Sequence, residues 1–193
     1  MGRPFGEGEN FPGPPQPREN ERPSLKQSLL ERLQRDQGVR RKFLENDQDV
    51  ALREEMDRVD RENTEWMKGL VQENGWPKVS EVGADGAQAA FLLVQHSPDA
   101  AFQRRCLDLM TPLVKEGEVS AVNWAYLLDR VLLAEGKKQV FGTQFLVGPD
   151  GKPELRPLEE PETVDARRAE LGLPPLEEYR KLVEDMHRRR KAP

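Results

Sequence analysis

The sequence predicts a mainly α-helical protein, a compact bundle of five to seven helices with a small β-hairpin near residues 139–158. Apolar residues recur at helical spacing between residues 24 and 187, and Gly or Pro pairs separate segments of helical length. Residues 89–94 are apolar on every side, which is typical of a segment surrounded by other helices. A buried strand would also fit so short a run, but its Ala pair and its continuation to His96 favour a helix.

Length and composition favour one domain. The chain has 193 residues, of which 36% are hydrophobic and 34% charged, and its mean hydropathy is −0.81. These values are typical of a helical domain with solvated outer faces and an unstructured tail. The net charge is −5, with basic and acidic residues intermixed. Nucleic-acid binding is therefore not expected, because it requires a one-sided basic surface.

The sequence also predicts a cytoplasmic location and no membrane span. No apolar run approaches the roughly 20 residues needed to cross a bilayer. The N-terminus lacks the apolar core of a signal peptide. The single cysteine excludes an internal disulfide, and a reducing cytoplasm is the simplest environment for such a chain.

The two ends of the chain are predicted to be tails around a helical domain at residues 24–187. Residues 1–23 are rich in proline and glycine and predict disorder. The alternative is a polyproline ligand for a partner protein, because Pro12–Pro15 spells PxxP. Residues 188–193 form a basic tail that complements a helix dipole or contacts an acidic partner.

Caps and breakers set the expected helices. Ser24 suits the cap of a first helix, and Gly75-Trp76-Pro77 ends the second. Ser97-Pro98-Asp99 predicts a helix start with a capping serine, and Pro112 is expected to bend or break the last turn of that helix. The expected helices cover about residues 24–46 and 47–74, then a central segment that follows Val82-Gly83 and ends near His96. A fourth helix has Pro98 at its first position and includes Leu113, and the others cover about 119–135, 161–172 and a last segment from Pro174.

Residues 139–147 change character and contain strand formers. Gly148-Pro-Asp-Gly151 predicts a turn, after which residues 154–158 return as a second strand. Pro153 and Pro157 confine that return strand to a sheet edge, because proline cannot donate to a ladder.

Polar residues lie where several apolar stripes should continue. A polar group that is buried without a hydrogen-bond partner lowers the folding stability by about 1–3 kcal/mol, and an unpaired charge lowers it further. We therefore expect them to converge and to satisfy one another or to line a polar pocket. The alternative for each residue is a stripe edge from which a long side chain reaches water. The predicted ligand-binding residues are Gln37, Arg40, Asn63, Gln95, Gln103, Arg130 and Gln144.

His96 and Asp129 are the predicted catalytic residues. His96 is the only histidine inside the folded region, and its reference pKa near ~6.5 suits proton transfer. Asp129 is a candidate for orienting the ring, and Arg40 or Arg130 for holding a carboxylate or phosphate. The alternative is that His96 is a hydrogen-bonded core residue.

Other chemistries fit poorly. Cys106 lies on an apolar stripe and is interpreted as a small core residue. Zinc needs several His or Cys ligands, and the chain has two histidines and one cysteine. The phosphate-loop, dinucleotide and nucleophile-elbow motifs are missing, so neither a cofactor nor a metal is predicted. A carboxylate site for Mg²⁺ or Ca²⁺ stays open.

Several short motifs follow one another along the chain: Asp36-Gln37 with Arg40, Gly75-Trp76-Pro77, Val82-Gly83, Gln95-His96, Phe102-Gln103, Asp129-Arg130, Gly142-Thr143-Gln144, Asp165, Arg168, Gly172-Leu173 and Tyr179. Their order and spacing resemble a helical domain family of unknown function that is found mostly in bacteria. The resemblance covers about residues 24–180. A tyrosine commonly precedes Gly-Thr-Gln in that pattern, and Phe141 stands there in this chain. The family implies no activity.

Two functional hypotheses follow from the sequence. The first is a polar pocket that binds a small polar or peptidic ligand, with or without acid–base chemistry at His96. The second is a non-enzymatic accessory or interaction module that uses the proline-rich tail or the basic C-terminus. Whether the protein is an enzyme stays open.

Overall fold

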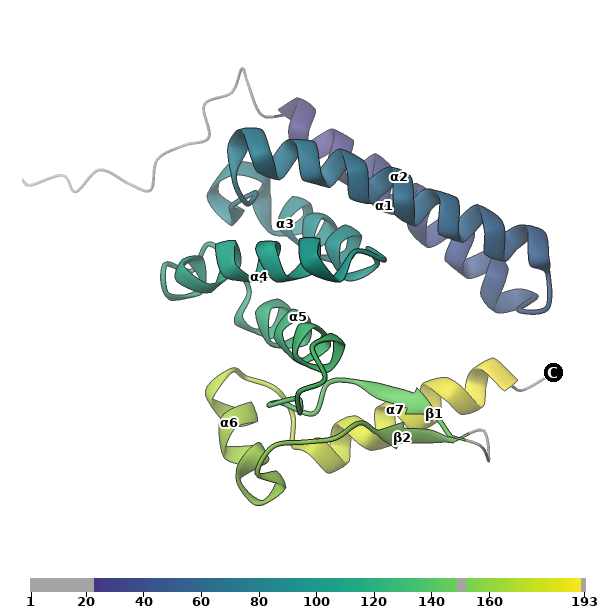
Figure 1. The fold of residues 1–193 in the computed structure, drawn as a ribbon, viewed down its shortest axis with the longest axis vertical. Helices are drawn as coiled ribbons and strands as arrows, with labels where there is room; N and C mark the ends of the chain where they lie inside the picture. Colours follow the sequence, from purple (N-terminus) through teal and green to yellow (C-terminus); the bar gives the residue numbers. More distant parts are fainter. Residues whose placement is uncertain (1–22, 149–151, 192–193) are drawn as a thin grey trace, which may run out of the picture.

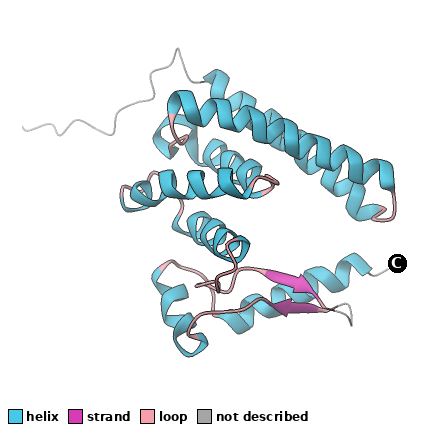
Figure 2. Ribbon diagram, viewed as in Figure 1, coloured by secondary structure: helices cyan, strands magenta, loops and turns pink. Residues whose placement is uncertain are grey.

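The structure is a computed structural model that describes residues 23–148 and 152–191. Apart from its last residue, the predicted N-terminal tail lies outside these ranges, as do turn residues 149–151. The described residues form seven α-helices and one two-stranded antiparallel sheet, which confirms the predicted fold class (Figure 2). The elements are α1 (Pro23–Glu45), α2 (Val50–Asn74), α3 (Val79–Gln95), α4 (Ala100–Lys115), α5 (Ala121–Ala134), β1 (Phe145–Val147), β2 (Pro153–Leu155), a 3-10 turn (Pro161–Thr163), α6 (Val164–Glu170) and α7 (Leu176–Lys191).

The helices stack in chain order. Helices α1 and α2 form a long antiparallel pair, and α3 packs against both. Helix α4 lies between α3 and α5, and the hairpin with α6 and α7 forms the opposite end of the molecule (Figure 1). The C-terminal end of α3 therefore lies near the middle of the stack.

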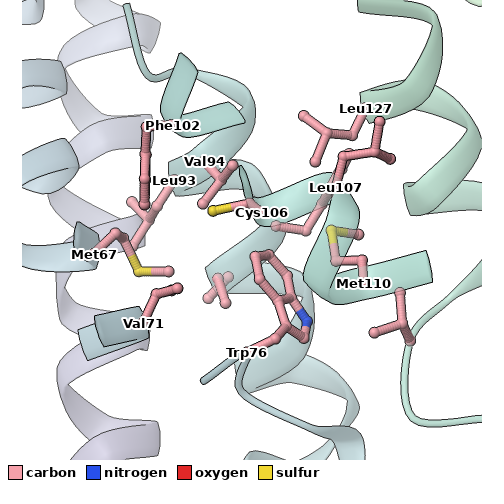
Figure 3. Close-up of a cluster of buried hydrophobic side chains, with 14 of the residues drawn as sticks. Met67, Val71, Trp76, Leu93, Val94, Phe102, Cys106, Leu107, Met110 and Leu127 are labelled. Atoms are coloured by element: carbon pink, nitrogen blue, oxygen red, sulfur yellow. The ribbon is translucent and has the colours of Figure 1, made fainter. Parts of the chain in front are cut away.

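The main core fills the space between α2, α3, α4 and α5. Figure 3 shows Met67 and Val71 of α2 facing Leu93 and Val94 of α3, with Trp76 beside them. Helices α4 and α5 complete the cluster with Phe102, Cys106, Leu107, Met110 and Leu127. Complete burial of these side chains supplies most of the hydrophobic stabilisation, at roughly 25 cal/mol per Å² of apolar surface.

Several helix boundaries differ from the sequence prediction: α2 begins at Val50 and not near residue 47, and the helix expected at 161–172 is a 3-10 turn followed by α6. Helix α3 begins at Val79 and bends at Gly83, whose φ of 73° is strained for any residue with a side chain. The cap of α4 is Asp99, whose carboxylate accepts the N–H of Phe102, and not the predicted Ser97. The hydroxyl of Ser97 is used elsewhere, because it accepts hydrogen bonds from Thr64 and from the Asp99 N–H.

Pro112 does not break α4, which continues to Lys115. A proline removes one N–H donor and so leaves the carbonyl four residues earlier, at Asp108, without its usual partner. The Asp108 side chain is 66% exposed. Water can therefore reach this side of the helix, which makes the interruption tolerable.

The hairpin forms within the predicted region, with Phe145 paired to Leu155 and Val147 to Pro153. A single parallel bridge joins Gln139 to Leu158. Helix α7 packs against β2 of this hairpin, and α6 contacts α7 (Figure 1). Helix α7 runs to Lys191, so most of the basic segment that was predicted as a tail forms its last turn.

Within residues 23–148 and 152–191, every helix is too short or too polar to cross a bilayer.

Candidate functional site

A buried carboxylate contacts the imidazole of His96. Asp36 lies on α1 with its side chain 1% exposed, and both of its oxygens are 3.1 Å from Nδ1 of His96, the residue that ends α3. An ionised carboxylate only accepts hydrogen bonds, so the geometry requires the ring proton on Nδ1. In the neutral ring this leaves a lone pair on Nε2.

The charge of Asp36 is stabilised by three donors. Besides the ring of His96, the amide of Gln37 donates at 2.8 Å and Nε of Arg40 at 3.2 Å. Burial would raise the pKa of the Asp36 carboxyl, but the hydrogen bond and charge of His96, with the charge of Arg40, hold this pKa below its usual value. Asp36 is therefore ionised at neutral pH.

Arg40 joins the carboxylates of two helices. Its Nη2 donates to Asp60 of α2 at 2.5 Å, while its Nε donates to Asp36. Nε of Arg40 also lies 3.1 Å from Nδ1 of His96. Two donors cannot bond each other, so this closeness reflects their shared acceptor, Asp36.

The pKa of Asp60 is shifted in the opposite direction to the pKa of Asp36. Burial raises the pKa of the Asp60 carboxyl above its usual value, and the negative charge of Asp36 adds to this, while Arg40 opposes both. The cluster thus contains one carboxyl with a lowered pKa, Asp36, and one with a raised pKa, Asp60.

The same three side chains could also coordinate a metal ion in place of the Arg40 guanidinium. Asp36, Asp60 and His96 offer ligand atoms within 4.8 Å of one another. The guanidinium of Arg40 contacts all three residues and supplies positive charge at this place. A metal would have to displace it, so the arrangement fits an arginine-centred cluster better than a metal centre.

Backbone contacts fix the segment that carries His96. The amide of Gln103, 4% exposed, lies at 3.0–3.2 Å from the carbonyls of Val94, Gln95 and Ser97. The carbonyl of Val94 also accepts the N–H of Ser97, whereas the carbonyls of Gln95 and Ser97 lie at or just beyond the end of α3, where helical N–H groups run out. Gln103 therefore acts as a cap that fixes the place of the His96 ring.

Three further predicted residues carry buried polar atoms without a partner among the described residues: Oε1 of Gln95, Nε of Arg130 and Nδ2 of Asn63. The other amide atom of Asn63 accepts from Arg32 at 3.2 Å. Burial lowers the pKa of the Arg130 guanidinium, and the positive charges of Arg156 and Arg40 lower it further. Arg130 of α5 is thus close enough to Arg40 to be repelled by it.

Asp129 lies in a second polar cluster. Its fully buried carboxylate accepts the backbone N–H groups of Val140, Phe141 and Thr143 and the hydroxyl of Thr143, at 2.7–3.0 Å for the shortest contact of each. Its hydrogen bonds thus go to the loop before β1, whereas the carboxylate that contacts His96 is Asp36. Asp129 fixes this loop against α5.

Gln144 belongs to the same second cluster. Its amide donates to the hydroxyl of Thr143 at 3.0 Å and its N–H to Oε1 of Gln139 at 2.9 Å. Gly142 makes the tight turn of the loop with a φ of 68°, and a Cβ there would come 2.8 Å from a methyl group of Leu176. A side chain at position 142 would therefore strain the backbone and force the side chain of Leu176 to move.

Sequence reasoning did not select three residues that complete these clusters: Asp60, Gln139 and Arg168. The guanidinium of Arg168 is fully buried and donates to the carbonyls of Phe141 and Pro174, both at 2.6 Å. Asp60 lies at the edge of the α2 stripe, and Arg168 lies in a short helix without a clear stripe. In the sequence, Arg168 was identified only as one of the motif residues shared with the family.

A cavity of about 260 Å³ lies apart from both clusters. It opens between α3 and the α4–α5 connection and is lined mainly by apolar side chains, among them Trp76, Phe91 and Met110. None of the predicted site residues lines it.

Comparison with curated proteins and with solved structures found no match. One family model does match, and it spans residues 23–191, which include both polar clusters. Its description is "Family of unknown function (DUF6624)". The chain therefore belongs to this family.

Proposed function

We propose that the protein binds a small polar or peptidic ligand beside His96 and that this histidine transfers a proton to or from it. The observation that carries the proposal is the contact between Nδ1 of His96 and the buried carboxylate of Asp36. A carboxylate in this position orients the ring and stabilises the imidazolium that forms when Nε2 takes a proton. Asp36 thus has the orienting role that the sequence suggested for Asp129.

The neighbouring polar groups suit ligand recognition. The buried Oε1 of Gln95 and the buried Nδ2 of Asn63 have no partner among the described residues, so in this proposal they serve as an acceptor and a donor for the ligand. Arg40 and Arg130 attract a negatively charged part of the ligand. Gln37 and Gln103 are positioning residues, since they contact Asp36 and the backbone around His96.

Asp129 and Gln144 have an indirect role in this proposal. Both connect the loop at 139–144 to α5, Asp129 through its carboxylate and Gln144 through the carbonyl of Tyr126. Arg130 is the residue of α5 that follows Asp129. We therefore treat both as positioning residues for Arg130 and not as groups that touch the ligand.

The test uses His96→Gln, with His187→Gln as the control because His187 is the other histidine of the chain. A panel of amino acids, dipeptides, sugars and nucleotides is screened for an increase in the melting temperature of the full chain. Compounds that stabilise the native protein should not stabilise the folded His96→Gln variant, and the control should respond as the native protein does.

If His96→Gln and His96→Ala both unfold, the histidine is a structural residue. If His96→Gln folds and responds to the same compounds, the proposal is wrong. A nitrogen NMR spectrum of the imidazoles provides a separate check, because the proposal requires the Nδ1–H tautomer for His96 and its loss in Asp36→Asn.

The second hypothesis, an interaction module, has one specific observation in its favour. Helix α7 exposes Leu182 (54%) and Met186 (51%), and β1 exposes Val147 (61%). Deletion of residues 1–22 and, separately, substitution of Leu182 and Met186 by serine would test it. Loss of a cellular activity in either variant, with the melting temperature unchanged, would favour the interaction module over the ligand site.

A further inference from the structure

Two arginines next to the candidate site each carry one buried donor atom that lacks an acceptor in the described part of the chain. Arg130 lies on α5 and Arg156 directly follows β2, and both side chains are half-buried. The Nε atom of each guanidinium is fully buried and has no hydrogen-bond partner among the described residues. An unsatisfied donor on a charged group is among the costliest features of a protein interior.

The fold holds these two arginines in place through their backbones. The amide of Gln139, which is fully buried, donates to the carbonyls of Arg156 and Gln144 at 2.9 and 3.1 Å. The N–H of Arg156 in turn donates to the carbonyl of Gln144. The carboxylate of Asp129 binds the same loop to α5, one residue before Arg130. A rigid frame therefore connects the two positions.

The charges of these arginines are not neutralised by the carboxylates around them. In the described part of the chain, Asp36 and Asp60 are bound to Arg40, and Asp129 is bound to backbone N–H groups. The groups that shift the pKa of Arg130 are its own burial and the positive charges of Arg156 and Arg40, without a compensating anion. Like charges held together in this way are typical of a site that is completed by an anionic ligand.

We propose that Arg130 and Arg156 together bind an oxyanion, a carboxylate or phosphate group of the ligand whose proton transfer is assigned to His96. This inference rests on the proposed function and specifies its ligand as an anion. Two guanidinium groups match the paired oxygens of either anion, and Arg40 adds long-range attraction from the His96 side. Arg156 is the residue that this inference adds to the site.

The experiment follows the side-chain Nε–Hε signals of the full-length protein by ¹⁵N NMR. Inorganic phosphate is titrated in one arm and acetate in the other, at constant ionic strength. The signals of Arg130 and Arg156 should shift in a saturable manner with one shared dissociation constant. A response to phosphate alone or to acetate alone identifies which oxyanion the site prefers, and both results support the proposal.

Substitutions test whether anion binding depends on both Arg130 and Arg156. Arg156→Gln should weaken the response at Arg130 roughly tenfold to hundredfold, since charge-assisted hydrogen bonds are lost. Arg130→Lys should also weaken binding, because an ammonium group lacks the two-pronged geometry. The matched control is Arg58→Gln, which removes an exposed arginine that is paired with Glu55 and Glu62, and it should bind as the native protein does.

The proposal is overturned if neither signal shifts, if the shifts grow linearly without saturation, or if Arg58→Gln weakens binding as much as Arg156→Gln. His96→Gln separates this inference from the proposed function. A folded His96→Gln variant should still bind phosphate or acetate, because the arginines are intact. Anion binding in that variant, together with unchanged ligand responses, would reject the role of His96 and leave the anion site standing.

Discussion

Nδ1 of His96 lies 3.1 Å from both oxygens of Asp36, across a sequence separation of 60 residues. One residue belongs to the first helix of the bundle and the other to the end of the third. The contact links two helices that pack side by side, and Arg40 extends it to α2 through Asp60. The first three helices thus build one ionic cluster at their junction.

Asp36→Asn should destabilise the protein by about 3 kcal/mol at pH 7, because it leaves Arg40 and His96 without their buried acceptor. The pKa of Asp36 is lowered by folding, so its ionisation stabilises the native state above the unfolded pKa near ~3.9. This stabilisation is lost as pH falls through the lower folded pKa. Urea unfolding at pH 7 and at pH 3 should show the difference from the native protein shrinking at acid pH. A constant difference would contradict the assigned charge.

Asp60→Asn should show the opposite pH dependence. Folding raises the pKa of Asp60, so the ionised carboxyl costs stability once pH exceeds the unfolded value near ~3.9. The native protein should therefore lose stability relative to Asp60→Asn as pH rises from that value through the higher folded pKa. Melting temperatures measured at several pH values between 4 and 7 test this. A relative gain of the native protein over this window would show that the attraction of Arg40 outweighs burial.

Gln103→Leu should cost about 1–3 kcal/mol of stability, because the carbonyls of Gln95 and Ser97 lose the donor that Gln103 supplies. The matched control is Gln88→Leu, which removes an exposed amide bonded to Asn123 and should change stability by less than about 0.5 kcal/mol. The NMR chemical shifts of the His96 ring should change in Gln103→Leu and stay the same in Gln88→Leu. Equal effects in the two variants would reject the capping role.

Asp129→Ala should release the loop at 139–144 and cost about 3 kcal/mol or more, since several buried N–H donors lose one shared acceptor. Hydrogen exchange should speed up at the amides of Val140, Phe141 and Thr143, while those of α2 change little under native conditions. Unchanged protection of the three loop amides would show that the loop is held by other contacts.

Cys106 should not react with thiol reagents in the native protein at pH 8. Its side chain is fully buried, and burial raises the pKa of the thiol to about 12, so almost no thiolate is present. Reaction with an aromatic disulfide should be limited by unfolding and should accelerate in urea. Fast stoichiometric labelling of the folded chain would contradict the core assignment.

Local sequence signals predicted the order of the elements well. Gly75-Trp76-Pro77 ends α2 close to its predicted limit, and the hairpin lies in the predicted segment. The errors came where two signals compete: Ser97 and Asp99 are both good caps, and the structure uses the second. At Pro112 the proline signal was overridden, because tertiary packing holds the helix on both sides.

The polar residues on apolar stripes were identifiable one by one, but their partners were not. Asp36, Asn63, Gln103 and Asp129 are all buried, as their stripe positions indicate. The structure then places Asp36 and Gln103 at His96 and Asp129 at the loop before β1, while Asn63 accepts from Arg32. A stripe shows which face of a helix is buried and contains no information on what that face meets.

The sequence by itself determined the helices, most of the breaks between them and part of the set of buried polar side chains, because periodicity and capping act over a few residues. Only the tertiary structure decided that Asp36, and not Asp129, contacts His96, and that Arg130 and Arg156 come together. These pairings depend on the rotation and axial shift of one packed helix against another. Side-chain packing along the whole contact fixes both quantities, and a local pattern specifies neither.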